Sequence, residues 1–215
     1  MTTIATLDAL HSLSVFSNNS GYVKPTMVAE KTVSPPYLHH SQLQLHIKNG
    51  RHPIVESLLN TPFVPNDTEF GKLQSMILTG PNMGGKTCYT RQVAIICLLA
   101  QMGSYVPAEE ATLSPLDAIY TRMGANDNPI KGQSTFLLEL QETSDILQRA
   151  TDRSLVILDE LGRGTSTHDG FAIAYATLHH IVSKVECFTI FVTHYPSLSR
   201  LSEGFPGQVA NYHIA

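Results

Sequence analysis

The residues best suited to chemistry form a glycine-rich loop at positions 80–87. The loop reads Gly80-Pro81-Asn82-Met83-Gly84-Gly85-Lys86-Thr87 and fits the phosphate-binding pattern GxxxxGK[ST]. Glycines let successive backbone N–H groups point at one anion, and a following helix presents its N-terminus to that anion. We therefore expect Lys86 to contact the β- and γ-phosphates of ATP and the Thr87 hydroxyl to bind Mg²⁺. The alternative is a chance glycine-rich turn, which a strand before the loop and a helix after it make less favourable.

Two adjacent acids follow an apolar segment at positions 155–158. The segment Leu155-Val156-Ile157-Leu158 is typical of a strand buried on both faces, and ligands of open α/β sheets bind at the carboxyl ends of such strands. Asp159 is expected to bind Mg²⁺, directly or through a water. Glu160 is expected to be the general base that deprotonates the attacking water. The alternative for Glu160 is a solvated acid at a strand end.

A histidine closes another apolar strand. His194 follows Phe188–Val192 and Thr193, so it is expected at the same edge of the sheet as the two acids. From there its ring can donate to the γ-phosphate or to the attacking water. A histidine at a strand end also often has a structural role only, and both interpretations stay open.

The elements around these residues alternate between strands and helices. That order predicts an α/β fold, with a mostly parallel sheet flanked by helices, right-handed crossovers and a short N-terminal helical segment. Residues 17–42 are rich in Ser, Asn, Pro and His and are expected to be a linker, with a domain boundary near residue 42. The expected strands are 43–48, 76–79, 118–123, 155–158 and 187–193; the expected helices are 1–16, 85–102, 135–150 and 170–182; and 60–72 is expected to be a loop.

Composition narrows the classes of partner. The formal net charge is −4 and no basic stripe is visible, so tight binding of DNA by this chain alone is not expected. The three cysteines form no CxxC pair, which favours a reduced intracellular protein, and Cys97 is expected to be buried. The longest apolar run is too short to span a bilayer, so no membrane partner is expected.

Further segments carry a resemblance to a known family. Together with the glycine-rich loop, they resemble the ATPase domain of the MutS mismatch-repair family. Finer matches at 103–111 and 154–176 resemble the eukaryotic branch that recognises insertion–deletion loops. The segments are Gly50-Arg51-His52-Pro53, Phe63-Val64-Pro65-Asn66-Asp67, Lys131-Gly132-Gln133-Ser134-Thr135-Phe136-Leu137-Leu138-Glu139, Gly162-Arg163-Gly164-Thr165-Ser166-Thr167-His168-Asp169-Gly170 and Thr193-His194-Tyr195.

The resemblance implies a P-loop NTPase of the ABC-ATPase type, in which two domains face each other and enclose two nucleotides. It implies that Ser134 serves the nucleotide of the partner domain, although Ser134 can also be a plain helix N-cap. It implies that the Gly162–Gly170 loop crosses the interface, while Asp169 can equally cap the next helix. Phe63 matches the position that stacks on adenine, or it is packed into the core. The segment at Gly132–Phe136 differs from the LSGGQ-type signature of other ABC ATPases.

The same resemblance implies a domain organisation and a biological role. Residues 1–42 would be the end of the lever helices with a linker, and residues 43–215 the MutS-type ATPase domain. The mismatch-binding, connector, lever and clamp domains and the C-terminal dimerisation segment are not in this sequence, so we expect a fragment of a longer protein. The expected function is ATP hydrolysis coupled to recognition of mismatched or looped DNA and to clamp movement, in the nucleus, with a second MutS homologue as heterodimer partner. The alternative is a nucleotide-binding interaction module with little hydrolysis.

Overall fold

The structure is a computed structural model that describes residues 2–18, 21–28, 43–124 and 135–214. Its contacts divide the chain into two compact units. Unit 1 comprises Met1–Gly71 and Arg91–Pro115, and unit 2 comprises Lys72–Thr90 and Leu116–Ala215.

Unit 1 contains a mixed sheet. Within the described residues its strand order is β1-β5-β2-β3, in which β1 runs parallel to β5 while β2 is antiparallel to both β5 and β3. The N-terminal helix is confirmed as α1, but its apolar residues Ile4, Leu7 and Leu10 are exposed. The elements are α1 (Thr2–Ser17), β1 (Thr26–Met27), β2 (Leu45–Gly50), α2 (Pro53–Leu58), β3 (Asn66–Phe70) and β5 (Glu110–Leu113).

The segment expected to be a linker contains the two-residue strand β1, and Val23 also pairs with Val106. One expectation for unit 1 is wrong. The segment expected to be a loop, 60–72, contains β3, whose Thr68 and Phe70 are buried while the residues between and before them are not. That alternation is the period of a half-buried strand, and pairing with β2 outweighs the turn-forming residues on either side.

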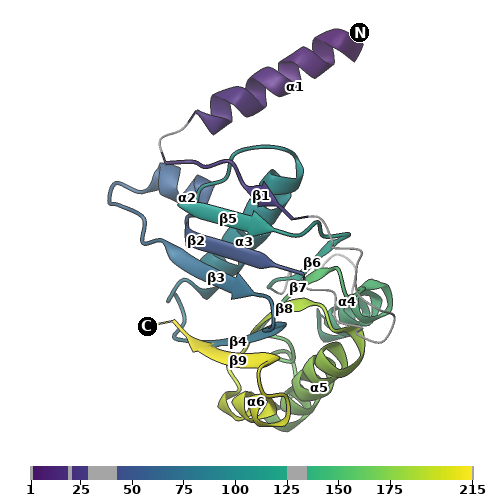
Figure 1. Cartoon of the computed structure of the whole chain (residues 1–215). Helices are drawn as coiled ribbons and strands as arrows, with labels where there is room; N and C mark the ends of the chain where they lie inside the picture. The colour runs from purple at the N-terminus through teal and green to yellow at the C-terminus, as the bar shows by residue number, and fades with distance from the viewer. Residues whose placement is uncertain (1, 19–20, 29–42, 125–134, 215) are drawn as a thin grey trace. The chain divides into compact units, whose positions relative to one another are not determined.

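Unit 2 is built on a parallel sheet flanked by helices (Figure 1). Among the described residues its strand order is β6-β7-β8-β4-β9, and every pairing in it is parallel. This confirms the α/β class and the mostly parallel sheet. The elements are β4 (Ser75–Thr79), β6 (Ile119–Arg122), α4 (Thr135–Arg149), β7 (Leu155–Asp159), α5 (Thr167–His180), a π turn (Ile181–Val185), β8 (Phe188–Val192), a 3₁₀ turn (Pro196–Arg200), α6 (Leu201–Gly204) and β9 (Val209–His213); α3 (Lys86–Gln101) begins in unit 2 and continues in unit 1.

The central strands of unit 2 are buried on both faces, as the apolar segment had predicted. Val156 and Leu158 of β7 belong to a cluster that includes Ile146 of α4 and Leu178 of α5. On β4, the Met76 sulfur accepts a hydrogen bond from the hydroxyl of Tyr89 at 3.7 Å, so the start of α3 packs on this sheet. Layers on both faces fix the carboxyl ends of the strands in place.

Two further expectations concerned the burial of Cys97 and the first residue of helix α5. Cys97 is fully buried, and burial raises the pKa of its thiol to about 12, as expected for an inert core cysteine. Helix α5 begins at Thr167, three residues earlier than the glycine expected to start it. No helix within the described residues has the length and apolarity needed to cross a bilayer.

Candidate active site

Three strands of unit 2 end side by side. Strand β8 lies between β4 and β7, and Val192 pairs with both Leu78 and Asp159. Past the ends of the strands, the Thr193 N–H donates to the Leu78 carbonyl at 3.0 Å and the Glu160 N–H donates to the Val192 carbonyl at 2.9 Å. The glycine-rich loop, the two acids and the segment containing His194 therefore leave the same edge of the sheet, as the sequence had predicted.

The glycine-rich loop adopts a conformation that needs its glycines. Gly80 has φ 150° and Gly85 has φ 93°, and a Cβ added at Gly80 would lie 2.6 Å from the Ile214 carbonyl oxygen. Met83 also has a positive φ, 65°, and its side chain is fully exposed. The loop thus turns sharply between β4 and α3, and α3 begins at Lys86 within it.

Lys86 lies inside this loop. Its side chain is 7% exposed, and Nζ donates to the carbonyl oxygens of Gly80 and Pro81, each at 2.8 Å. A buried ammonium needs such partners. Because both acceptors belong to the loop, the positive charge is held against the residues that are expected to surround phosphate.

The two predicted metal ligands are in direct contact. The Thr87 hydroxyl, in the first turn of α3, donates to Asp159 Oδ2 at 2.9 Å. A hydroxyl and a carboxylate oxygen are the hard ligands that Mg²⁺ prefers. Within the described parts of the chain no group of three or more His, Cys, Asp or Glu side chains is placed to hold a metal.

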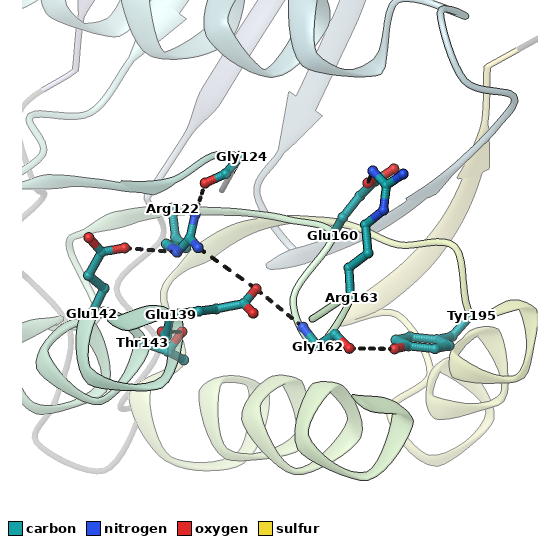
Figure 2. Close-up of polar contacts among 9 residues, drawn as sticks. All are labelled: Arg122, Gly124, Glu139, Glu142, Thr143, Glu160, Gly162, Arg163 and Tyr195. Atoms are coloured by element: carbon teal, nitrogen blue, oxygen red, sulfur yellow. Dashed lines mark hydrogen bonds and ion pairs between the residues drawn. The ribbon is translucent and has the colours of Figure 1, made fainter. Parts of the chain in front are cut away.

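Glu160 turns away from the line of β7. Its φ is 56°, a left-handed value that few residues other than glycine adopt. Its side chain is 19% exposed, and Oε2 pairs with Arg163 Nη1 at 2.6 Å (Figure 2). The strained backbone directs the carboxylate differently from that of Asp159, and the two neighbouring acids therefore have different partners.

His194 is exposed at the end of the segment that follows β8, and its ring centroid lies 4.0 Å from that of Tyr195. Tyr195 is buried, and burial raises the pKa of its phenol, with a further contribution from the charge of Glu139. Its hydroxyl donates to the Gly162 carbonyl at 2.9 Å. The ring of His194 thus packs against a buried, hydrogen-bonded tyrosine, and the exposed side of the ring is accessible to a ligand.

The Gly162–Gly170 loop packs closely on itself. A Cβ at Gly162 would lie 2.6 Å from the Gly170 carbonyl oxygen. Ser166 is the N-cap of α5: its Oγ accepts from the Asp169 N–H at 3.2 Å and donates to Asp169 Oδ2 at 2.7 Å. The residue that caps α5 is therefore Ser166 and not Asp169, which lies in the first turn of the helix and accepts from the Ser166 hydroxyl.

Two further residues were predicted to contact nucleotide. Ser134 lies outside the described residues. Phe63 belongs to unit 1, in the segment between α2 and β3, and is half-buried. Their predicted contacts with a partner's nucleotide and with adenine stay predictions.

Sequence reasoning missed a buried ion pair beside the site. Glu139 of α4 and Arg122 of β6 are 6% and 7% exposed. Glu139 lies one turn before Thr143, on the inward face of the expected helix, and a charged residue there was the signal available. No spacing rule indicated that its partners would be a strand residue and a loop amide.

Comparison with known proteins identifies the family. Residues 76–215 match the family described as MutS domain V, and the chain belongs to the MutS family. It is 52% identical over 214 residues to the DNA mismatch repair protein MSH3 of Arabidopsis thaliana, across 99% of this chain and 19% of that protein. It is 54% identical to the protein of the same name from Coccidioides immitis, and 50% identical to human Msh3, in each case across 98% of this chain and 18% of the relative. The chain therefore spans about a fifth of the length of these curated relatives.

Proposed function

We propose that this chain binds ATP with Mg²⁺ and hydrolyses it, as a P-loop NTPase of the ABC-ATPase type. The observation that carries the proposal is the 2.9 Å contact between the Thr87 hydroxyl and Asp159 Oδ2. It joins the end of the glycine-rich loop to the carboxyl end of a buried strand, where an α/β sheet binds its ligands.

Phosphate recognition falls to residues 80–87. The amides of the loop and of the first turn of α3 supply hydrogen-bond donors, and the helix dipole favours an anion there. Lys86 exchanges its two carbonyl partners for the more strongly negative β- and γ-phosphates. Thr87 and Asp159 fit a Mg²⁺ that arrives with the nucleotide, and this cation neutralises phosphate charge.

Water activation falls to Glu160. In this proposal its carboxylate accepts a proton from the water that attacks the γ-phosphate. His194, from the adjacent strand end, donates to the γ-phosphate or orients the water. Phe63 stacks on adenine, and Ser134 contacts the nucleotide of a partner domain.

The family suggests the role of this reaction. We propose that residues 43–215 form the ATPase domain of a nuclear DNA mismatch repair protein, preceded at 1–42 by the end of the lever helices and a linker. ATP turnover would be coupled to recognition of mismatched or looped DNA and to clamp movement. The partners are a second MutS-homologue ATPase domain, in a heterodimer, and DNA bound through segments outside this chain. The names of the relatives, all DNA mismatch repair proteins, support this.

The first test compares Glu160→Gln with wild type. We expect calorimetry to detect Mg²⁺-dependent ATP binding in both proteins, because the amide is isosteric and the phosphate loop is unchanged. Turnover should fall by about 10²–10⁴-fold, the usual contribution of general base catalysis. Glu203→Gln, an exposed acid on α6, is the control and should match wild type. Equal turnover in wild type and Glu160→Gln would remove the catalytic role, and absence of Mg²⁺-dependent ATP binding would remove the whole proposal.

A second candidate is a nucleotide-dependent interaction module with little hydrolysis. The 2.6 Å pair between Glu160 and Arg163 favours it, because a carboxylate oxygen that contacts the guanidinium is already occupied and not directed at a water. Intact ATP binding with near-zero turnover at every protein concentration would support this candidate over the enzyme.

A further inference from the structure

Glu139 is a carboxylate that the proposed reaction does not use. It lies on α4, at the interior of unit 2, with 6% of its surface exposed. A buried carboxylate is costly unless it is paired and hydrogen-bonded. The groups that Glu139 contacts therefore indicate its role in the fold.

Glu139 contacts the turn at residues 160–163, which includes the proposed general base Glu160. Glu139 Oε1 accepts a hydrogen bond from the Gly162 N–H at 3.3 Å and lies 4.0 Å from Arg122 Nη2 (Figure 2). Arg122 is oriented in turn by Glu142, whose Oε2 lies 2.8 Å from its Nε, and by the Gly124 carbonyl. The carboxylate thus joins helix α4 and strand β6 to one backbone amide.

Gly162 is held from both sides. Its N–H donates to Glu139, and its carbonyl accepts from the buried Tyr195 hydroxyl at 2.9 Å. Its φ is 87°, and the backbone of Gly170 packs against it so closely that a Cβ at either glycine would collide with the other. These contacts restrain the turn on both sides of Gly162.

That turn contains the proposed base. Gly162 is two residues after Glu160, and Arg163, which pairs with Glu160, follows Gly162. Glu160 has a positive φ, a conformation that costs energy and persists only when its surroundings enforce it. Tyr195, which supplies the second anchor, directly follows His194.

We propose that Glu139 is a positioning residue: through the Gly162 N–H it fixes the turn that places Glu160, and it acts together with Tyr195, which binds the carbonyl of the same residue. The proposal rests on the function proposed above. It predicts an effect on the rate of the chemical step rather than on the binding of ATP, because Glu139 belongs neither to the phosphate loop nor to the pair of metal ligands.

The test compares variants of the whole chain at saturating Mg²⁺ and ATP. Glu139→Met keeps the volume but loses the acceptor, and we expect its single-turnover rate to fall about tenfold, the effect of losing one hydrogen bond to a charged group. Its Kd for ATP should stay within about twofold of wild type. Glu139→Gln keeps an acceptor oxygen for the Gly162 amide and should retain most of the rate. Asp145→Asn, which changes an exposed acid on the same helix, is the matched control and should equal wild type.

A purely structural role gives a different result. Loss of rate matched by weaker ATP binding, or equal loss in Glu139→Gln and Glu139→Met, would overturn the proposal. If Glu139→Met does not fold, Tyr195→Phe removes the second anchor and should also lower the rate several-fold without changing the Kd for ATP. A rate within twofold of wild type in Tyr195→Phe would then overturn it.

Failure of the proposed function is recognised separately. A folded wild type without Mg²⁺-dependent ATP binding or turnover refutes the enzyme, and amide hydrogen exchange then decides the anchor. We expect faster exchange across residues 160–163 in Glu139→Met than in wild type. Unchanged exchange would show that Glu139 does not restrain this turn.

Discussion

At the scale of single residues, two glycines determine how closely the segment after Glu160 approaches its neighbours. A Cβ added at Gly170 would lie 2.1 Å from the Tyr195 hydroxyl oxygen and 2.3 Å from the Gly162 carbonyl oxygen. Both atoms belong to the hydrogen bond that anchors the turn. A side chain at position 170 therefore cannot be added without breaking that bond or moving backbone.

We predict that Gly170→Ala destabilises the fold by about 2 kcal/mol or more, in the range found for overpacked interiors. The measurement is the free energy of unfolding in urea. Gly204→Ala is the matched control, because Gly204 also lies in a helix but an added Cβ there meets nothing within 4 Å; it should be neutral or slightly stabilising. Equal stability of the two variants would contradict the close approach.

The sequence predicted much of the cluster at the sheet edge, but not its internal contacts. Motif spacing and strand periodicity predicted that Thr87, Asp159 and His194 lie at one edge of the sheet, because the carboxyl ends of parallel strands lie together. Spacing carries no information about partners distant in sequence. The pair between Arg122 and Glu139 joins a strand to a helix, and only the packed fold brings the two side chains together.

At the scale of elements, periodic segments were predictable and edge segments were not. Helix α3 and strand β7 have strong apolar patterns and were found within a few residues of their expected bounds. Strand β9 has one buried residue, Val209, followed by mostly exposed positions, and β1 has only two residues. Such strands exist through backbone pairing with a neighbour, so their side chains carry little signal.

Helix α2 offers a prediction about pH. Its N-cap is His52, 6% exposed, whose Nδ1 accepts from the Val55 N–H at 3.3 Å. Burial lowers the pKa of His52, its own backbone hydrogen bond opposes this, and the positive charge of Arg91 lowers it further. A protonated Nδ1 cannot accept the capping bond, so the folded state favours the neutral ring.

The direction of the pH effect follows from the depressed folded-state pKa. Between that pKa and the ordinary value of 6.5, the unfolded chain binds more protons at this ring, so stability rises with pH. The contribution is complete above about pH 6.5 and is lost as the pH falls below it. We expect His52→Asn, which keeps a capping side chain, to lose less stability than wild type between pH 7 and pH 5. Parallel curves in urea unfolding would show that His52 does not titrate in this way.

At the scale of the whole molecule, the chain is a part of what its relatives contain. It matches them over nearly its full length but covers 18–19% of theirs. Unit 2 contains the glycine-rich loop, the contact between Thr87 and Asp159, and the proposed base Glu160 at one sheet edge. In the composite arrangement that we propose, Ser134 of a facing domain contacts the nucleotide bound there.

Turnover should therefore depend on encounter between two such domains. We predict that the rate of ATP hydrolysis per mole of chain rises with protein concentration, because pairing completes each site by mass action. Steady-state phosphate release measured over a hundredfold range of concentration checks this, with Glu160→Gln as the inactive control at every point. Constant, non-zero turnover per mole would mean that one copy carries a complete site. Turnover near zero throughout, with ATP still bound, would instead identify a nucleotide-dependent binding module, because the residues that we propose hold the phosphates and their cation, the glycine-rich loop with Thr87 and Asp159, all lie within unit 2.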